Sequence, residues 1–217
     1  MTDFLRLNRM HYPVTVLGYG TRAGIWLQGC TIGCLGCASR DTWDPEAGED
    51  VPCATIIRWL DSLAGPVDGI TVSGGEPFQQ PGRLAALLTE LDEWRGRRHE
   101  PVDLLVFSGY AWPRLAKQPE CADALTHCDA VVAGPYVERR NAGTALRGSD
   151  NQEIVTLTEL GARRYGGSEP LAGPAMQVCL EGDVVRLIGI PRRGDLDRMR
   201  TGFLEHGLTL EDVTWLG

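Results

Sequence analysis

Three cysteines lie within eight residues of this chain, and they form its most reactive sequence pattern. Cys30, Cys34 and Cys37 have the spacing C-x3-C-x2-C, and no fourth cysteine follows at short range. Three thiolates can bind three irons of a cubane iron–sulfur cluster and leave the fourth iron free for another ligand. An open metal position distinguishes reactive sites from structural ones, by the logic that holds for zinc. The spacing therefore indicates an enzyme.

A zinc knuckle is the structural alternative for the same cysteines. Zinc sites usually combine one C-x2-C pair with a second pair downstream. The sequence has no second pair of this kind, and its four histidines are scattered. The pattern therefore favours an iron–sulfur cluster. The other cysteines, which we expect to be ordinary small hydrophobic residues, are Cys53, Cys121, Cys128 and Cys179.

A second motif, Gly74-Gly75-Glu76-Pro77, follows an expected buried strand over residues 70–73. Glycine permits close backbone approach at a strand end, and Glu76 offers an acceptor for an ammonium-type donor. In isolation this run is compatible with a surface turn. Its position after a buried strand, 37 residues beyond Cys37, points to ligand binding instead.

Strands that alternate with helices must position these motifs. Such alternation predicts βαβ units and a parallel sheet, in which ligands bind at the carboxyl ends of the strands. Cys30, Gly74, Ser108 and Gly134 each follow an expected strand, so we expect one shared site. The expected strands cover residues 4–10, 24–28, 70–73, 102–107 and 129–133, and the expected helices cover 52–63, 84–91 and a segment interrupted by Pro119.

The bulk properties exclude several classes of protein. With 217 residues, 43% hydrophobic and 23% charged, the chain has the composition of one folded domain plus an appendage. The net charge of −8, without a basic stripe, argues against nucleic-acid binding. Neither a signal segment nor an apolar run near the ~20 residues of a membrane helix is visible. We therefore expect a cytoplasmic protein without a nucleic-acid or membrane partner, in a reducing compartment where clustered cysteines bind metal.

The cysteine loop and the Gly-Gly-Glu-Pro run together resemble the two motifs of radical S-adenosylmethionine enzymes. The resemblance implies that Cys30, Cys34 and Cys37 hold a [4Fe-4S] cluster whose fourth iron is chelated by S-adenosylmethionine. It also implies that Gly74, Gly75, Glu76 and Pro77 hold the amino group of that cofactor. Reductive cleavage would then give methionine and a 5′-deoxyadenosyl radical. No catalytic residue is expected beyond the cluster.

A finer resemblance is to the short activating enzymes of glycyl radical enzymes, above all the anaerobic ribonucleotide reductase activating enzymes. It implies hydrogen abstraction from a glycine Cα of a partner enzyme, with flavodoxin or ferredoxin as the external reductant. The matching stretches are Trp26-Leu-Gln-Gly-Cys30, Cys34-Leu-Gly-Cys37, Asp41-Thr-Trp43, residues 70–79, Ser108-Gly-Tyr110, Gly134-Pro-Tyr136 and residues 147–152.

Polar residues near the predicted strand ends are further candidates for the cofactor site. Ser108, Tyr110, Arg147 and Ser149 are expected to bind the carboxylate and ribose of S-adenosylmethionine, or the substrate backbone. Ordinary turn chemistry is the alternative, because serine favours turns for local reasons.

The sequence also departs from the subgroup. Gly18-Tyr-Gly20 stands where the subgroup has Gly-Pro-Gly, and Ala38-Ser-Arg40 stands where it has His-Asn-Pro. These differences concern the target of the reaction more than its chemistry. Only Cys53 lies between Cys37 and Gly74, so a second cluster is not expected.

The predicted fold is α/β, a partial (β/α) barrel with an open parallel sheet and a small C-terminal ββα appendage. We expect a radical S-adenosylmethionine core over residues 1–158, a linker over 159–174 and the appendage over 175–217. Two alternative functions stay open. One is a radical enzyme for a small molecule or another peptide, with the appendage as its recognition module. The other is a non-catalytic iron–sulfur electron carrier, which has no need of the Gly-Gly-Glu-Pro run.

Overall fold

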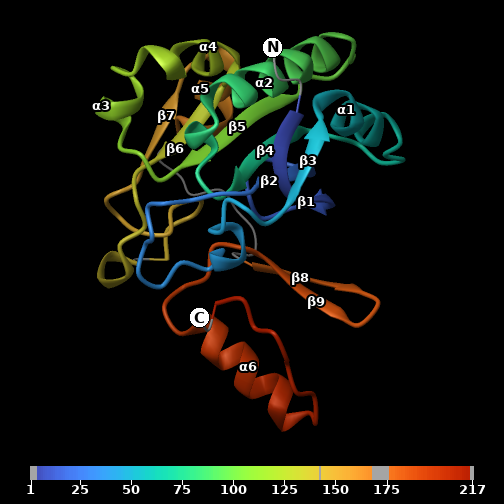
Figure 1. Ribbon diagram of the computed structural model, residues 1–217, viewed down its shortest axis with the longest axis vertical. Coiled ribbons are helices and arrows are strands. Elements are labelled where there is room, and N and C mark those ends of the chain that lie inside the picture. The colour runs from blue at the N-terminus through green and yellow to red at the C-terminus, as the bar shows by residue number, and fades with distance from the viewer. Residues whose placement is uncertain (1–3, 142, 168–175, 216–217) are drawn as a thin grey trace.

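Four parallel strands form the centre of an open seven-stranded sheet in the computed structural model, which describes residues 4–141, 143–167 and 176–215 (Figure 1). The order is β3-β1-β2-β4-β5-β6-β7, with β1, β3 and β7 antiparallel to their neighbours. The expected α/β fold with an open, mainly parallel sheet is confirmed. The strands are β1 Phe4–Val14, β2 Arg22–Leu27, β3 Glu49–Pro52, β4 Gly69–Gly74, β5 Asp103–Ser108, β6 Ala130–Ala133 and β7 Glu153–Thr156.

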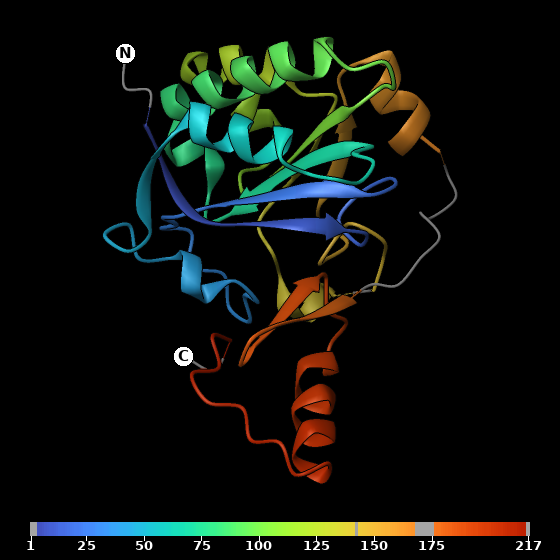
Figure 2. The same ribbon diagram turned by 90° about the vertical axis from the view of Figure 1, so that its right-hand side faces the viewer.

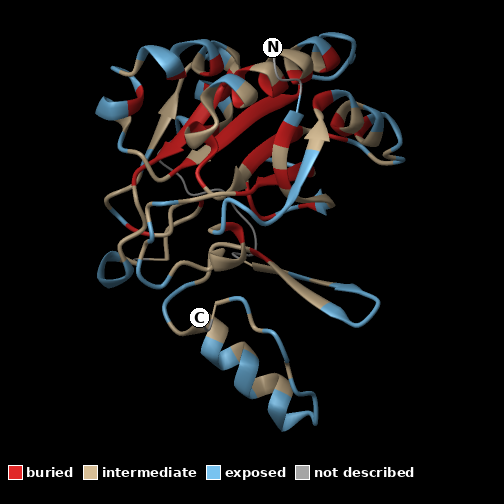
Figure 3. Ribbon diagram, in the orientation of Figure 1, coloured by how far each residue is buried: buried red, intermediate tan, exposed pale blue. Residues whose placement is uncertain are grey.

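Helices cover one face of this sheet, and the opposite face meets the cysteine loop and the C-terminal hairpin (Figure 2). The covering helices are α1 Cys53–Asp61, α2 Pro81–Gly96, the short α3 Trp112–Leu115 and α4 Pro119–His127. Helix α2 buries Leu84, Leu87, Leu88 and Leu91, the i, i+3, i+4, i+7 pattern of an amphipathic helix. Figure 3 shows the buried residues concentrated in the strands and in the helix faces that meet them. In the parts of the chain that the structure describes, no helix is long and apolar enough to cross a membrane.

The segment expected as a linker begins instead with a helix, α5 Glu159–Tyr165. Thr158 caps this helix by accepting the Gly161 N–H. A Cβ at Gly161 would collide with the Asp129 carbonyl, so this glycine permits close packing of α5 on the sheet. Glycine at this position made the segment resemble a linker in the sequence, whereas the structure uses this glycine for close packing. The rest of the expected linker, beyond residue 167, lies outside the described residues.

The C-terminal appendage has the expected ββα form. Strands β8 Met176–Glu181 and β9 Val184–Gly189 pair as an antiparallel hairpin, and helix α6 Asp195–Glu205 follows. The hairpin lies between the loop face of the main sheet and α6 (Figure 2). We call the described residues 176–215 the C-terminal unit.

A buried ion pair fixes the amino ends of the central strands. The guanidinium of Arg22 in β2 forms a two-pronged contact with Asp103 in β5, at 3.0 and 2.8 Å, and both side chains are inaccessible. The Tyr165 hydroxyl of α5 donates to the same carboxylate at 2.7 Å. Burial acts to raise the pKa of Asp103, but Arg22 holds that pKa below its ordinary value. The carboxylate therefore stays ionised and joins β2, β5 and α5.

Replacing Asp103 by Asn should destabilise the fold by about 3–5 kcal/mol, because it leaves the Arg22 charge buried without its counter-ion. Asp50→Asn is the matched control, since the Asp50 side chain is half-exposed in its pairs with Arg6 and Arg83. That change should cost less than about 1 kcal/mol. Equilibrium urea unfolding followed by circular dichroism measures both free energies. Equal losses in the two variants would contradict the assignment.

Candidate active site

The cysteine loop leaves the carboxyl end of β2 and is held there by backbone hydrogen bonds. Gly29 N–H donates to the Thr42 carbonyl at 2.8 Å, and Cys30 N–H donates to the Trp43 carbonyl at 3.0 Å. Between these anchors the chain turns through Gly33 and Gly36, both in the left-handed region with φ of 66° and 73°. The loop therefore presents its three cysteines on the sheet face opposite helices α1, α2 and α4 (Figure 2).

Backbone N–H groups point at the sulfur atoms of all three cysteines. The thiol of Cys30 accepts from Ile32 and Gly33, and that of Cys34 accepts from Tyr136. The Cys37 sulfur accepts from Ser39 N–H at 3.4 Å. Partial burial raises the pKa of the Cys30 and Cys34 thiols, and these donors oppose the rise. Hydrogen bonds to sulfur are one of the means by which proteins tune iron–sulfur clusters.

The donor set fits a cubane cluster. Cys30, Cys34 and Cys37 are free thiols of intermediate exposure, so all three are available as ligands. Among the described residues, no three metal-binding side chains converge closely enough for a single ion. A cubane requires no such convergence, because each thiolate binds a different iron. The loop therefore suits a cluster better than a lone metal ion.

The Gly-Gly-Glu run lies directly against the start of the cysteine loop. Gly75 N–H donates to the Leu27 carbonyl at 2.8 Å, and Glu76 N–H donates to the Gly29 carbonyl at 2.9 Å. A Cβ on Gly75 would collide with the Gly29 carbonyl, and one on Gly74 would collide with the Leu27 backbone. The two glycines are therefore required for the two motifs to touch.

The carboxylate of Glu76 is fully buried and joins the ends of β4 and β5. It accepts hydrogen bonds from Ser108 Oγ at 2.8 Å, Gly109 N–H at 2.6 Å and Phe78 N–H at 3.0 Å. Burial raises the pKa of Glu76, and these donors oppose the rise. Sequence reasoning brought Glu76 and Ser108 to one sheet edge but missed their direct bond. A contact between this carboxylate and the cofactor amino group stays a prediction.

Residues 147–152 hold the loop that follows β6. The Gln152 side chain donates to the Gly134 carbonyl at 2.8 Å and accepts from Gly148 N–H at 2.7 Å. The Asn151 side chain donates to the Pro135 carbonyl at 2.8 Å. Because Tyr136 in this loop donates to the Cys34 sulfur, the 147–152 segment positions a donor of the cluster site.

Arg147 and Ser149 take part in the same loop contacts. Arg147 donates to the Gln152 carbonyl at 3.2 Å, and the buried Ser149 hydroxyl accepts Val137 N–H at 3.1 Å. The Ser149 bond joins two segments twelve residues apart, so it differs from the local turn chemistry of the alternative. Binding of the cofactor by either residue stays a prediction.

Tyr110 lies next to the site but makes protein contacts. Its N–H donates to Ser108 Oγ at 3.0 Å, and its ring packs under the Arg114 guanidinium at 3.5 Å. A role for Tyr110 in cofactor binding also stays a prediction. Of the remaining cysteines, Cys53, Cys121 and Cys128 are buried, whereas Cys179 lies half-buried in the C-terminal unit.

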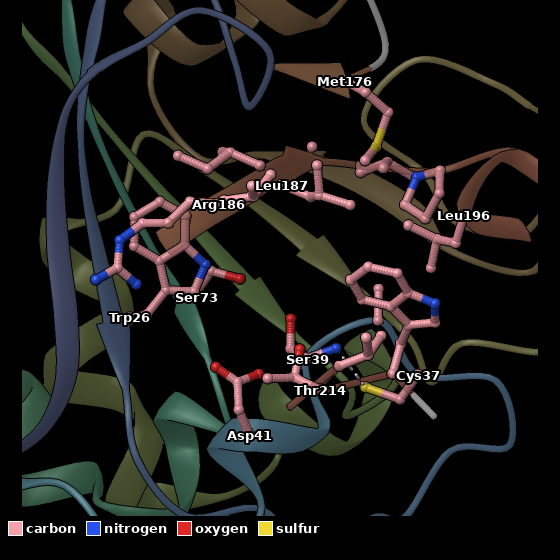
Figure 4. Close-up of a pocket in the computed structure, with 18 of the residues that line it drawn as sticks. Trp26, Cys37, Ser39, Asp41, Ser73, Met176, Arg186, Leu187, Leu196 and Thr214 are labelled. Atoms are coloured by element: carbon pink, nitrogen blue, oxygen red, sulfur yellow. Dashed lines mark hydrogen bonds between the residues drawn. The ribbon is translucent and has the colours of Figure 1, made fainter. Parts of the chain in front are cut away.

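A cavity of about 670 Å³ opens beside Cys37 (Figure 4). The sheet contributes Trp26, Ser73 and Phe107 to its lining, and the cysteine loop contributes residues 36–39 and Asp41. The C-terminal unit supplies most of the remaining lining. Sequence reasoning gave this unit a role in recognition only in the alternative of a small-molecule or other peptide substrate, and it named no residue of the unit as part of the site.

Gly75→Ala should lower the amount of cluster bound severalfold, because the new Cβ displaces the Gly29 carbonyl and with it the cysteine loop. Iron and sulfide per chain after anaerobic reconstitution measure the effect. Gly82→Ala is the control, since a Cβ at Gly82 in α2 meets nothing within 4 Å. A full cluster in the Gly75 variant would refute the contact.

Comparison with known proteins agrees with this geometry. The family described as 4Fe-4S single cluster domain matches residues 16–155. The anaerobic ribonucleoside-triphosphate reductase-activating protein of Haemophilus influenzae is 33% identical over 150 residues, which cover 66% of this chain and 94% of the relative. The protein of the same description from Enterobacteria phage T4 is 29% identical, covering 68% and 92%.

Two more distant similarities complete the comparison. The pyruvate formate-lyase-activating enzyme of Staphylococcus aureus is 37% identical over 87 residues, covering 36% of this chain and 34% of that enzyme. The crystal structure of QueE from Escherichia coli covers 60% of this chain and 70% of its own, with 15% identity and a TM-score of 0.40. The family match spans the cysteine loop, the Gly-Gly-Glu run and the strand ends. The chain is therefore a radical S-adenosylmethionine enzyme with a [4Fe-4S] cluster, and it belongs to the family of the anaerobic ribonucleoside-triphosphate reductase-activating proteins.

Proposed function

We propose that this chain installs a glycyl radical on a partner enzyme of the anaerobic ribonucleoside-triphosphate reductase class. The observation that carries the proposal is the packing of the Gly-Gly-Glu run on the cysteine loop, beside a cavity that reaches Cys37. The relatives named for activation of that reductase support the choice of partner, because this chain spans nearly their whole length.

When bound, the cluster and S-adenosylmethionine supply a 5′-deoxyadenosyl radical, formed together with methionine by one-electron reduction. The glycine Cα of the partner donates a hydrogen atom to it, which leaves a glycyl radical and 5′-deoxyadenosine. Residues of this chain hold and shield the reactants. Cys30, Cys34 and Cys37 would hold the cluster, and the N–H groups aimed at the Cys30 and Cys34 sulfur atoms oppose the rise that burial causes in the pKa of these two thiols.

The backbone of the Gly-Gly-Glu run lines the approach to the cluster. Its strand-end position and its glycines allow a ligand to come close to the main chain, as the amino group of S-adenosylmethionine would require. The cavity beside Cys37 offers space for the reactants next to the cysteine loop.

An external electron donor completes the reaction. Leu35, between two of the ligand cysteines, is 73% exposed, so the cysteine loop is reachable from the surface. Flavodoxin or ferredoxin is the proposed donor. A reducing cytoplasm is the proposed location, because it keeps clustered thiols available for metal.

A small-molecule substrate is the second candidate. The cavity volume of about 670 Å³ favours it, because small-molecule sites typically measure ~300–1,000 Å³. The two candidates share the first half-reaction and differ in the donor of the hydrogen atom.

Anaerobic reconstitution followed by dithionite and S-adenosylmethionine should yield 5′-deoxyadenosine. Addition of an anaerobic ribonucleoside-triphosphate reductase from the same organism should then yield a glycyl radical that electron paramagnetic resonance detects. Cys34→Ala should abolish cluster and product together, because two thiolates cannot replace three. Cys53→Ser is the control, since Cys53 is not in the cysteine loop.

The results of these experiments distinguish the candidate functions. 5′-Deoxyadenosine without a glycyl radical would favour the small-molecule candidate. A spectroscopically intact cluster without any 5′-deoxyadenosine would favour the electron carrier and overturn the proposal.

A further inference from the structure

The C-terminal unit forms a wall of the reaction cavity, yet it lies beyond the residues that the family match covers. The family match ends at residue 155. The Pasteurella multocida relative is covered over 96% of its length but accounts for only 69% of this chain. Residues from β9, α6 and the following segment nevertheless line the cavity beside Cys37. This wall is therefore an addition to a core that already carries the cluster site.

One face of strand β8 fixes the unit to the core. The Gln177 side chain donates to the Pro13 carbonyl at 2.7 Å and accepts Thr15 N–H at 3.0 Å. His11 lies between two further residues of that face, 3.3 Å from Cys179 Sγ and 2.9 Å from Glu181 Oε1. Alternate residues of β8 therefore contact β1 and its extension.

The strand partners of this face extend the same attachment. Ile188, which pairs with Gln177, is buried beside Val14, Val16, Leu17 and Trp26. One face of the hairpin therefore packs against the core, and this packing sets the position of the hairpin over the cavity.

The opposite face of the hairpin is apolar. Met176 and Leu187 lie on that face, because their registers alternate with those of Gln177 and Ile188. Leu196 from α6 joins them in the cavity lining. Figure 4 shows these three side chains across the cavity from Cys37, Ser39 and Asp41. These three side chains therefore form an apolar patch in a lining to which the C-terminal unit also contributes polar residues, Arg186 and Thr214 among them (Figure 4).

A hydrogen-bond donor lies in the same lining. The Nε1–H of Trp215 is buried, and no acceptor for it exists among the described residues. A buried indole N–H normally has a partner, so a ligand that brings a carbonyl oxygen would satisfy it. A peptide backbone provides such a carbonyl.

We propose that Met176, Leu187 and Leu196 form a recognition subsite for an apolar side chain that neighbours the reacting glycine in the partner's polypeptide segment. The subsite rests on the proposed function, since it needs a peptide as the hydrogen donor. An apolar side chain gains free energy on leaving water for this wall, whereas a polar one loses hydrogen bonds there. The C-terminal unit thus selects the segment, and the core performs the chemistry.

Two synthetic hexapeptides test the subsite, each with one glycine deuterated at Cα. One carries leucine on both sides of the glycine, and the other carries serine. The cluster-loaded full chain with S-adenosylmethionine should bind the leucine peptide at least about tenfold more tightly in calorimetry, because a few methylene groups discriminate to that extent. Deuterium recovered in 5′-deoxyadenosine should show the same preference in kcat/KM.

Leu187→Ala and Leu196→Ala should each reduce the preference for leucine severalfold. Leu180→Ala is the matched control, because Leu180 lies on the same hairpin, is 75% exposed and does not line the cavity. Circular dichroism confirms that the variants are folded. Met176→Ala provides a second test of the same wall.

Two outcomes overturn different claims. Equal binding of the two peptides, or an unchanged preference in the Leu187 and Leu196 variants, refutes the subsite. Calorimetric preference for leucine without deuterium transfer from either peptide supports the subsite and refutes glycine as the hydrogen donor.

Discussion

The site depends on close contact between two backbones. The Gly-Gly-Glu run and the start of the cysteine loop are joined by N–H to carbonyl bonds at distances that leave no room for a side chain. This contact sets where the cysteines stand relative to the ends of β4 and β5. The Glu76 carboxylate then extends the connection to Ser108 and Gly109. The start of the cysteine loop and the ends of β4 and β5 therefore form one unit, although three separate segments supply it.

Much of this arrangement follows from the sequence because local patterns were strong. The cysteine spacing and the four buried strands predicted a shared edge, and α2 followed from its leucine periodicity. The edge strands β3 and β7 were missed, because four residues are too few for a clear alternation. Helix α5 was missed because Gly161 resembles a linker residue until its packing against Asp129 is known.

Side-chain roles were harder to predict than side-chain positions. Ser108, Arg147 and Ser149 do lie near strand ends, but their observed bonds are to the protein itself. Whether a serine binds a ligand or a neighbouring loop depends on distances between segments remote in sequence, and no local pattern encodes these. For the same reason, the sequence did not predict that the C-terminal unit lines the cavity beside Cys37. Its lining residues approach Cys37 only through the attachment of β8 to β1.

The buried pair of Arg22 and Asp103 lies at the amino ends of β2 and β5, whereas the reactive groups lie at the carboxyl ends. The ion pair that stabilises the fold and the groups that react thus lie at opposite ends of the strands. Loops at the reactive edge can be lengthened, exchanged or covered by a new segment while the opposite edge maintains the fold. That division gives the scaffold a tolerance for evolutionary change where new partners are met, and it keeps the buried pair of Arg22 and Asp103 away from the reactive edge.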